Sequence, residues 1–162
     1  MKPSESWESR VADLWKRIDE FAPEEFVLQV DRLAAELPPA SAEGVFERAC
    51  AQDSTGHPDR AIPLYQQALD TGLSGIRRRR AVIQMASSLR NLGNAERAAD
   101  LLAAELDAPS DELDEAVRGF LALALVDLGR EREAAAMSLS ALARYLPRYN
   151  KSLARYAQGI LS

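Results

Sequence analysis

The sequence has little of what disulfide-rich and metal-binding proteins need. Among 162 residues there is one cysteine, Cys50, and one histidine, His57. A single cysteine excludes an internal disulfide framework and fits a reducing compartment. One cysteine and one histidine do not provide the ligand spacing of a usual zinc site, and there is no glycine-rich phosphate loop. We therefore expect neither a metal nor any other cofactor.

Long apolar runs are missing as well. The longest strongly apolar run, residues 120–126, is far shorter than the roughly 20 residues that a membrane helix needs. The first seven residues lack the apolar core of a signal peptide. A net charge of −5 gives no general attraction for nucleic acid or anionic membranes. These absences predict a cytoplasmic protein without a membrane or nucleic-acid partner.

Aromatic residues make up only 6% of the chain, and β-branched residues are sparse. Alanine, leucine, arginine and glutamate, which favour helices, are abundant. The sequence therefore predicts an all-α fold. The segment 121–125 alternates in side-chain size as a strand can, but it lies inside a helix-length segment between Ser110 and Gly129, which favours a helix.

Capping residues divide the chain into helices. Ser41 and Ser110 are expected N-caps, and Pro23 and Pro58 fit first helical positions. The predicted helices cover about 7–21, 23–37, 41–52, 58–71, 75–92, 95–106, 110–128, 131–146 and 149–160. Residues 53–56, which begin with Asp53 and end with Gly56, are predicted to form the turn between the third and fourth helices.

Three segments repeat one pattern. Gly56, Gly93 and Gly129 follow one another at intervals of 37 and 36 residues. A fixed period in this range predicts a stacked repeat array, a type of fold that usually offers a binding surface. Alanines recur at equivalent places before and after these glycines, where they allow two helices to cross closely: Ala49, Ala86 and Ala122, then Ala61, Ala98 and Ala134.

The repeated pattern resembles the tetratricopeptide repeat, W-x₂-L-G-x₂-Y…A-x₃-F…P. The opening tryptophan is absent, and the period exceeds the usual 34 residues. The matching positions are Val45, Arg48, Ala49, Gln52, Ala61 and Tyr65; Val82, Met85, Ala86, Leu89, Ala98 and Leu102; and Arg118, Leu121, Ala122, Leu125, Ala134, Ser138 and Pro147.

The resemblance implies a solenoid, or α-α superhelix, of antiparallel helix pairs. Three repeats would occupy 41–73, 75–109 and 110–147. A degenerate hairpin over 1–40 would precede them and a capping helix over 148–162 would follow, all in one domain.

Three shorter segments, 65–69, 72–75 and 83–93, are similar to a group of short bacterial tetratricopeptide repeat proteins. That similarity implies protein–protein contacts, with dimerisation as a further property, and it lends no catalytic residue.

In this family the first helix of each pair lines a concave groove. The resemblance therefore implies that a partner contacts Phe46, Cys50, Arg80, Gln84, Ser87, Asn91, Phe120, Leu123 and Asp127. A second interpretation is that the C-terminal helix covers the apolar members. The family's clamp for chaperone tails needs lysines, asparagines and an arginine, and this chain has other residues there: Phe46, Cys50, Gln84, Ala116 and Phe120.

Four consecutive arginines, Arg77–Arg80, begin a predicted helix, where the helix dipole disfavours cations. One interpretation is an anion site for a phosphorylated, acidic or nucleic-acid partner. The other is a row of salt bridges to acidic residues on neighbouring first helices, with Glu43 and Glu47 on one side and residues 111–115 on the other.

Catalysis is disfavoured, because Cys50 and His57 are the only candidate nucleophile–base pair and are separated by almost two helical turns. The leading hypothesis is a non-catalytic module that binds a segment of another protein or a peptide in its groove. The alternative is a homodimeric assembly protein that uses aromatic residues of its terminal helices, and a third hypothesis is a regulatory anion- or nucleic-acid-binding protein that uses Arg77–Arg80. The candidate dimer surface is Trp7, Trp15, Tyr149 and Tyr156.

Overall fold

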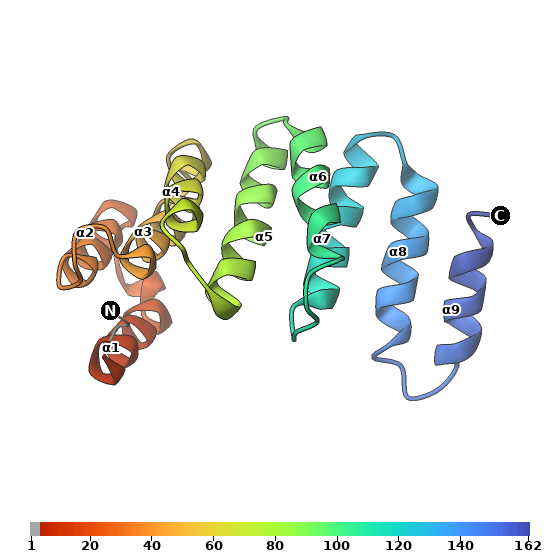
Figure 1. The fold of residues 1–162 in the computed structure, drawn as a ribbon, viewed down its shortest axis with the longest axis horizontal. Coiled ribbons are helices and arrows are strands. Elements are labelled where there is room, and N and C mark those ends of the chain that lie inside the picture. The colour runs from red at the N-terminus through yellow and green to blue at the C-terminus, as the bar shows by residue number, and fades with distance from the viewer. Residues whose placement is uncertain (1–3) are drawn as a thin grey trace. The chain divides into compact units, whose positions relative to one another are not determined.

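The computed structural model describes residues 4–162, and all regular structure in that part is helical (Figure 1). The predicted all-α class is confirmed, and segment 121–125 lies inside a helix. In chain order the elements are α1 (Glu5–Lys16), a 3₁₀ helix (Ile18–Glu20), α2 (Pro23–Ala34), α3 (Ala42–Ser54), α4 (Pro58–Asp70), α5 (Gly75–Asn91), α6 (Ala95–Glu105), α7 (Asp114–Asp127), α8 (Glu131–Ala143) and α9 (Asn150–Gly159).

The chain divides into two compact units, the first ending at Ser88 and the second covering Leu89–Ser162. In the first unit α2 packs on α3 and α3 packs on α4. In the second unit α6, α7, α8 and α9 pack in succession. In these pairs each helix packs on its neighbour in sequence, as a repeat array requires.

Most helix starts follow the expected local chemistry. The Ser41 hydroxyl caps α3 by accepting a hydrogen bond from the Gly44 N–H at 3.4 Å. Pro23 and Pro58 occupy the first turns of α2 and α4, where a missing N–H has no cost.

The predicted cap at Ser110 is wrong, because α7 begins only at Asp114. The Ser110 hydroxyl donates a hydrogen bond to Asp114 Oδ2 at 2.7 Å. Asp111 Oδ1 accepts a hydrogen bond from the Leu113 N–H at 2.8 Å and so stabilises a turn instead of a first helical turn.

Three helices end clearly earlier than predicted. The first helix stops at Lys16, and a 3₁₀ helix follows where a longer α-helix was expected to reach residue 21. The second, α2, ends at Ala34 and not at residue 37. In the last pair, α8 ends at Ala143 and not at residue 146. Apolar residues continue past all three ends, so their spacing did not mark them.

The repeated glycines and alanines have the expected roles. Gly56, Gly93 and Gly129 lie between paired helices with φ of 87°, 84° and 70°, a left-handed conformation that other residues adopt at a cost. The six repeated alanines are all buried. Small side chains in the interior let paired helix backbones approach closely.

Candidate interaction surface

The long helix α5 presents four of the predicted partner-binding residues along one face. Arg80, Gln84, Ser87 and Asn91 follow one another at steps of four, three and four residues, which is the spacing of a single helical face. Arg80 and Asn91 are exposed, and Gln84 and Ser87 are partly exposed. This face therefore offers charged and amide groups to solvent.

Phe46 and Cys50 were predicted on the same surface, but both side chains are buried. The Arg80 guanidinium lies 5.2 Å from the centre of the Phe46 ring and covers it. The Cys50 thiol donates a hydrogen bond to Gln84 Oε1 at 3.5 Å. Phe46 and Cys50 therefore contact the Arg80 and Gln84 side chains of α5 from the protein interior and do not themselves face solvent.

Cys50 also lacks the chemistry of a nucleophile. Burial, and then the nearby Glu47 carboxylate, raise the pKa of its thiol to about 12. Its hydrogen-bond acceptor is Gln84, whereas His57 lies at the N-cap of α4. A thiol that stays protonated at neutral pH does not attack substrates.

The first of the four arginines, Arg77, lies in an ion-pair network within the first unit. Its guanidinium contacts Glu8 Oε2 at 2.6 Å and Glu47 Oε1 at 3.3 Å. Glu47 Oε2 in turn accepts a hydrogen bond from Trp15 Nε1 at 2.8 Å. The pair with Glu47 agrees with the salt-bridge interpretation, while the pair with Glu8 ties α1 to α5 and was not predicted.

The two carboxylates of this network are shifted in opposite directions. The hydrogen bond from Arg77 lowers the pKa of Glu8. Burial raises the pKa of Glu47, against the hydrogen bond from Trp15 and the charge of Arg77. Arg77 is therefore largely neutralised by protein carboxylates, which argues against its use as an anion site.

A second polar contact, at the partly buried Asp53, joins α3 to α4 and α5 and was not predicted. Asp53 Oδ1 accepts a hydrogen bond from the Ser88 hydroxyl at 2.8 Å, and Asp53 Oδ2 accepts one from the Tyr65 hydroxyl at 3.2 Å. Ser88 is itself buried. In the sequence, Asp53 was assigned only to a turn, and its spacing from Tyr65 and Ser88 carries no signal of this contact.

In the second unit, α7 provides the other predicted binding residues. Leu123 is 45% exposed, whereas Phe120 is only partly exposed. Asp127 pairs with Arg90 at 2.6 Å. The C-terminal helix α9 packs on α8 and leaves Leu123 accessible, so α9 does not cover this residue.

The predicted dimer surface is divided between core and solvent. Trp7 is buried, and its Nε1 donates a hydrogen bond to the Leu33 carbonyl at 2.8 Å. Trp15 packs 4.9 Å from the Phe26 ring. Both tryptophans thus pack within the N-terminal helices, Trp7 buried and Trp15 partly buried. Tyr149 and Tyr156, by contrast, are largely exposed.

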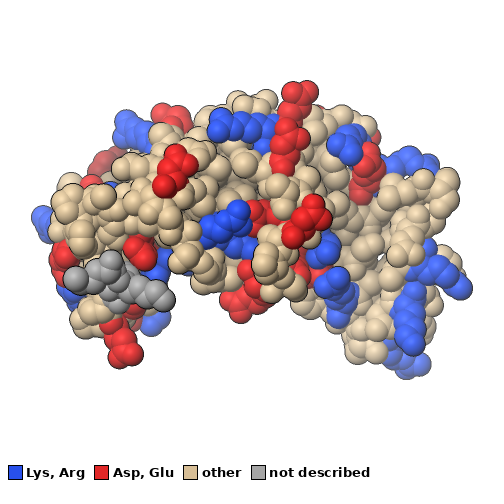
Figure 2. All heavy atoms as spheres, viewed as in Figure 1, with Lys and Arg blue, Asp and Glu red and all other residues tan. Residues whose placement is uncertain are grey.

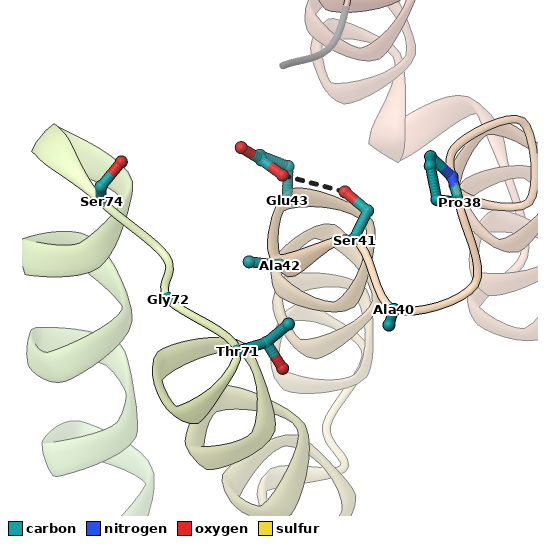
Figure 3. A pocket seen from close by; sticks show the side chains of 8 residues that line it. All are labelled: Pro38, Ala40, Ser41, Ala42, Glu43, Thr71, Gly72 and Ser74. Atoms are coloured by element: carbon teal, nitrogen blue, oxygen red, sulfur yellow. Dashed lines mark hydrogen bonds between the residues drawn. The ribbon is translucent and has the colours of Figure 1, made fainter. Parts of the chain in front are cut away.

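A small recess of about 340 Å³ lies where the N-terminus of α3 meets the turn after α4 (Figure 3). Ser41 and Glu43 line one side, and Thr71, Gly72 and Ser74 line the other. The Ser41 hydroxyl donates to Glu43 Oε2 at 2.9 Å, as the dashed line in Figure 3 shows. The helix start therefore already has an internal carboxylate beside it.

Residues 4–162 contain no cluster of three or more histidine, cysteine, aspartate or glutamate side chains that is able to hold a metal ion. None of their helices has both the length and the apolar character needed to cross a bilayer.

Comparison with known proteins gives one match. A family model described as Tetratrico peptide repeat matches residues 42–160. The matched segment begins at α3 and ends in α9, so it includes every helix that carries the repeated pattern. Neither the curated proteins nor the solved structures include a significant match.

Proposed function

Because the chain belongs to the tetratricopeptide repeat family, we propose that it is a non-catalytic module that binds a segment of another protein along the first helices of its repeats. Members of this family are in general protein–protein interaction modules. In this proposal the exposed face of α5 and, separately, the exposed face of α7 contact the partner, and no chemical step is assigned to any residue.

The observation that carries this proposal is the composition of those exposed faces. On α5, Arg80, Gln84 and Asn91 offer donors and acceptors that an extended backbone is able to use. On α7, Leu123 and Val126 are each nearly half exposed and offer apolar contacts. Polar groups that fix orientation, together with exposed apolar side chains, are typical of peptide-binding surfaces.

Two other functions have less support. A dimer built on the terminal aromatic residues has less support at its N-terminal half, because Trp7 is buried and Trp15 is partly buried with its Nε1 bonded to Glu47. An anion site at Arg77–Arg80 loses Arg77 to Glu8 and Glu47, and Arg80 covers Phe46.

The test is capture of proteins from a native lysate by the immobilised chain. We expect the double variant Arg80→Glu with Asn91→Ala to lose proteins that the parent retains, and Leu123→Asp to lose them as well. The matched control is Arg97→Glu with Gln67→Ala, which makes the same kinds of change at exposed positions of the second helices α6 and α4. If both groove variants retain the same proteins as the parent, the proposed surface is wrong.

A further inference from the structure

The C-terminal end of the second unit is unusually basic and unusually apolar for an exposed surface. Residues 134–162 contain four cationic side chains and no carboxylate side chain. On the face drawn in Figure 2, the lower right, where Figure 1 places α9, shows blue atoms and no red ones, whereas the two carboxylates of α8 lie in its first turn, at Glu131 and Glu133. We name this the C-terminal surface; it consists of Leu142, Arg144, Tyr145, Arg148, Tyr149, Lys151, Arg155, Tyr156 and Leu161.

Its tyrosines are arranged for contact with another molecule. Tyr145, Tyr149 and Tyr156 are 69%, 74% and 64% exposed. The guanidinium of Arg148 lies 5.7 Å from the Tyr149 ring, and that of Arg155 lies 5.2 Å from the Tyr156 ring. Exposed tyrosine and arginine are among the residues that dominate protein interfaces.

A basic recess lies beside these tyrosines. It encloses about 350 Å³ between the end of α8 and the start of α9, with Arg144 and Lys151 in its wall. Arg144 contacts Glu115 at 2.9 Å but remains more than half exposed. The recess therefore presents positive charge and fits carboxylate side chains.

The opposite character occurs at the N-terminal helices. Residues 4–36 contain nine acidic and four basic side chains. Several of these acids already pair locally, as Glu36 does with Arg10 and Glu20 does with Arg17. Glu24 and Glu25, in the first turn of α2, are exposed. Leu28, one turn further along the same helix, is 56% exposed.

Next to Glu24 is a recess of about 290 Å³ between α2, the end of α3 and the start of α4. Val27 and Leu28 form its apolar wall, and Gln52, His57 and Arg60 line the other side. Gln52 Oε1 is buried and accepts no hydrogen bond within residues 4–162. An aromatic side chain with a hydroxyl donor suits such a recess, because it supplies both apolar contact and the missing hydrogen bond.

From these two complementary ends we propose that copies of this chain associate head to tail, with the C-terminal surface of one copy docked on the acidic α2 end of the next. Glu24 and Glu25 face the basic recess, and a tyrosine enters the recess beside Leu28. Two C-terminal surfaces do not pair with each other, because like charges repel. A single head-to-tail contact leaves one C-terminal surface and one acidic α2 end of the pair unoccupied, so further copies are able to add.

Sedimentation velocity of the purified full-length chain tests the idea. Between about 10 µM and 300 µM, the average sedimentation coefficient should rise with concentration. The rise should shrink when salt is increased from about 0.1 M to about 1 M, where the Debye length falls from about 10 Å to about 3 Å.

Charge reversal then identifies the two surfaces. Arg148→Glu with Arg155→Glu should weaken association about tenfold or more, and so should Glu24→Arg with Glu25→Arg. When these two variants are mixed, each reversed surface meets an opposite charge again, and association should return. The matched control is Glu96→Arg with Asp100→Arg on α6, which should leave association unchanged. Tyr149→Ser with Tyr156→Ser should weaken it while all charges remain.

The possible results show which molecule, if any, binds the C-terminal surface. A parent chain that stays monomeric over the whole range overturns the inference. Association that only the C-terminal reversal abolishes points to self-paired C-terminal surfaces, and also overturns it. So does a monomer whose C-terminal surface binds an oligouridylate or an acidic peptide. Circular dichroism of all variants should match the parent, because every substituted side chain is exposed. Glu24→Arg with Glu25→Arg and the control with Glu96→Arg should each melt slightly earlier, because both place arginine in the first turn of a helix.

Discussion

Several single residues in this chain hold neighbouring helices together through side-chain contacts. Arg77 is the clearest case, because one guanidinium contacts carboxylates from α1 and α3 and lies 5.9 Å from the Trp7 ring. Glu47 is almost fully buried in this network. A buried ion pair contributes little net stability, yet removing one partner is expensive because the other is left uncompensated.

Glu47 therefore allows a prediction with two variants. Glu47→Ala leaves Trp15 Nε1 without an acceptor and Arg77 with one carboxylate fewer, and it should lower the free energy of unfolding by about 1–3 kcal/mol at pH 7. Glu47→Gln keeps an acceptor for Trp15 and should cost clearly less. Urea unfolding measures both values, and equal losses for the two variants would show that the Trp15 hydrogen bond has no role.

The same residue should be visible in the pH dependence of stability. Because burial raises the pKa of Glu47 above 4.5, the folded protein binds this proton more tightly than the unfolded chain does. The contribution of Glu47 is thus most favourable below pH 4.5 and is lost as pH rises through the raised pKa. Glu8 acts in the opposite sense, because its pKa is lowered. The Glu47→Gln variant should lack the decline with rising pH, and the Glu8→Gln variant should lack the loss on acidification.

At the scale of the helix, the repeat depends on small residues at buried crossing points. Ala98 on α6 has no exposed surface. Replacement by phenylalanine should force α6 away from its neighbours and cost about 1–3 kcal/mol of stability through overpacking. Ala103→Phe, at an exposed position of the same helix, is the control and should be nearly neutral. Thermal melts of the two variants decide, and similar melting temperatures would mean that the assigned register is wrong.

Helices and repeats were predictable because their signals are local. The glycine period, the prolines at helix starts and the Ser41 cap depend only on residues close in sequence. The start of α7 was not predictable in this way. Serine is a common N-cap residue, but the Ser110 hydroxyl donates a hydrogen bond to the Asp114 side chain and does not cap the helix. Which residues of a helix face reach solvent depends on long-range contacts. Arg80 and Gln84 cover Phe46 and Cys50, and spacing alone places all four on one surface.

For the whole molecule, burial and charge are unevenly distributed along the chain. α3 has eight buried residues among thirteen, whereas α9 has one among ten. Residues 134–162 contain basic and no acidic side chains, and acidic residues outnumber basic ones in residues 4–36. The least buried helix is therefore also part of the surface proposed to receive another copy.

Hydrogen exchange should reveal both the low burial of α9 and its proposed contact with another copy. In dilute protein at high salt, its amides should exchange well before those of α3, because local opening of a sparsely buried terminal helix exposes little apolar surface. In concentrated protein at low salt, head-to-tail contacts should slow exchange in α9 and at the start of α2 but leave α3 unchanged. Mass spectrometry of peptides from these helices measures the difference. Fast exchange in α9 that does not respond to concentration would support the local opening argument and contradict the proposed association.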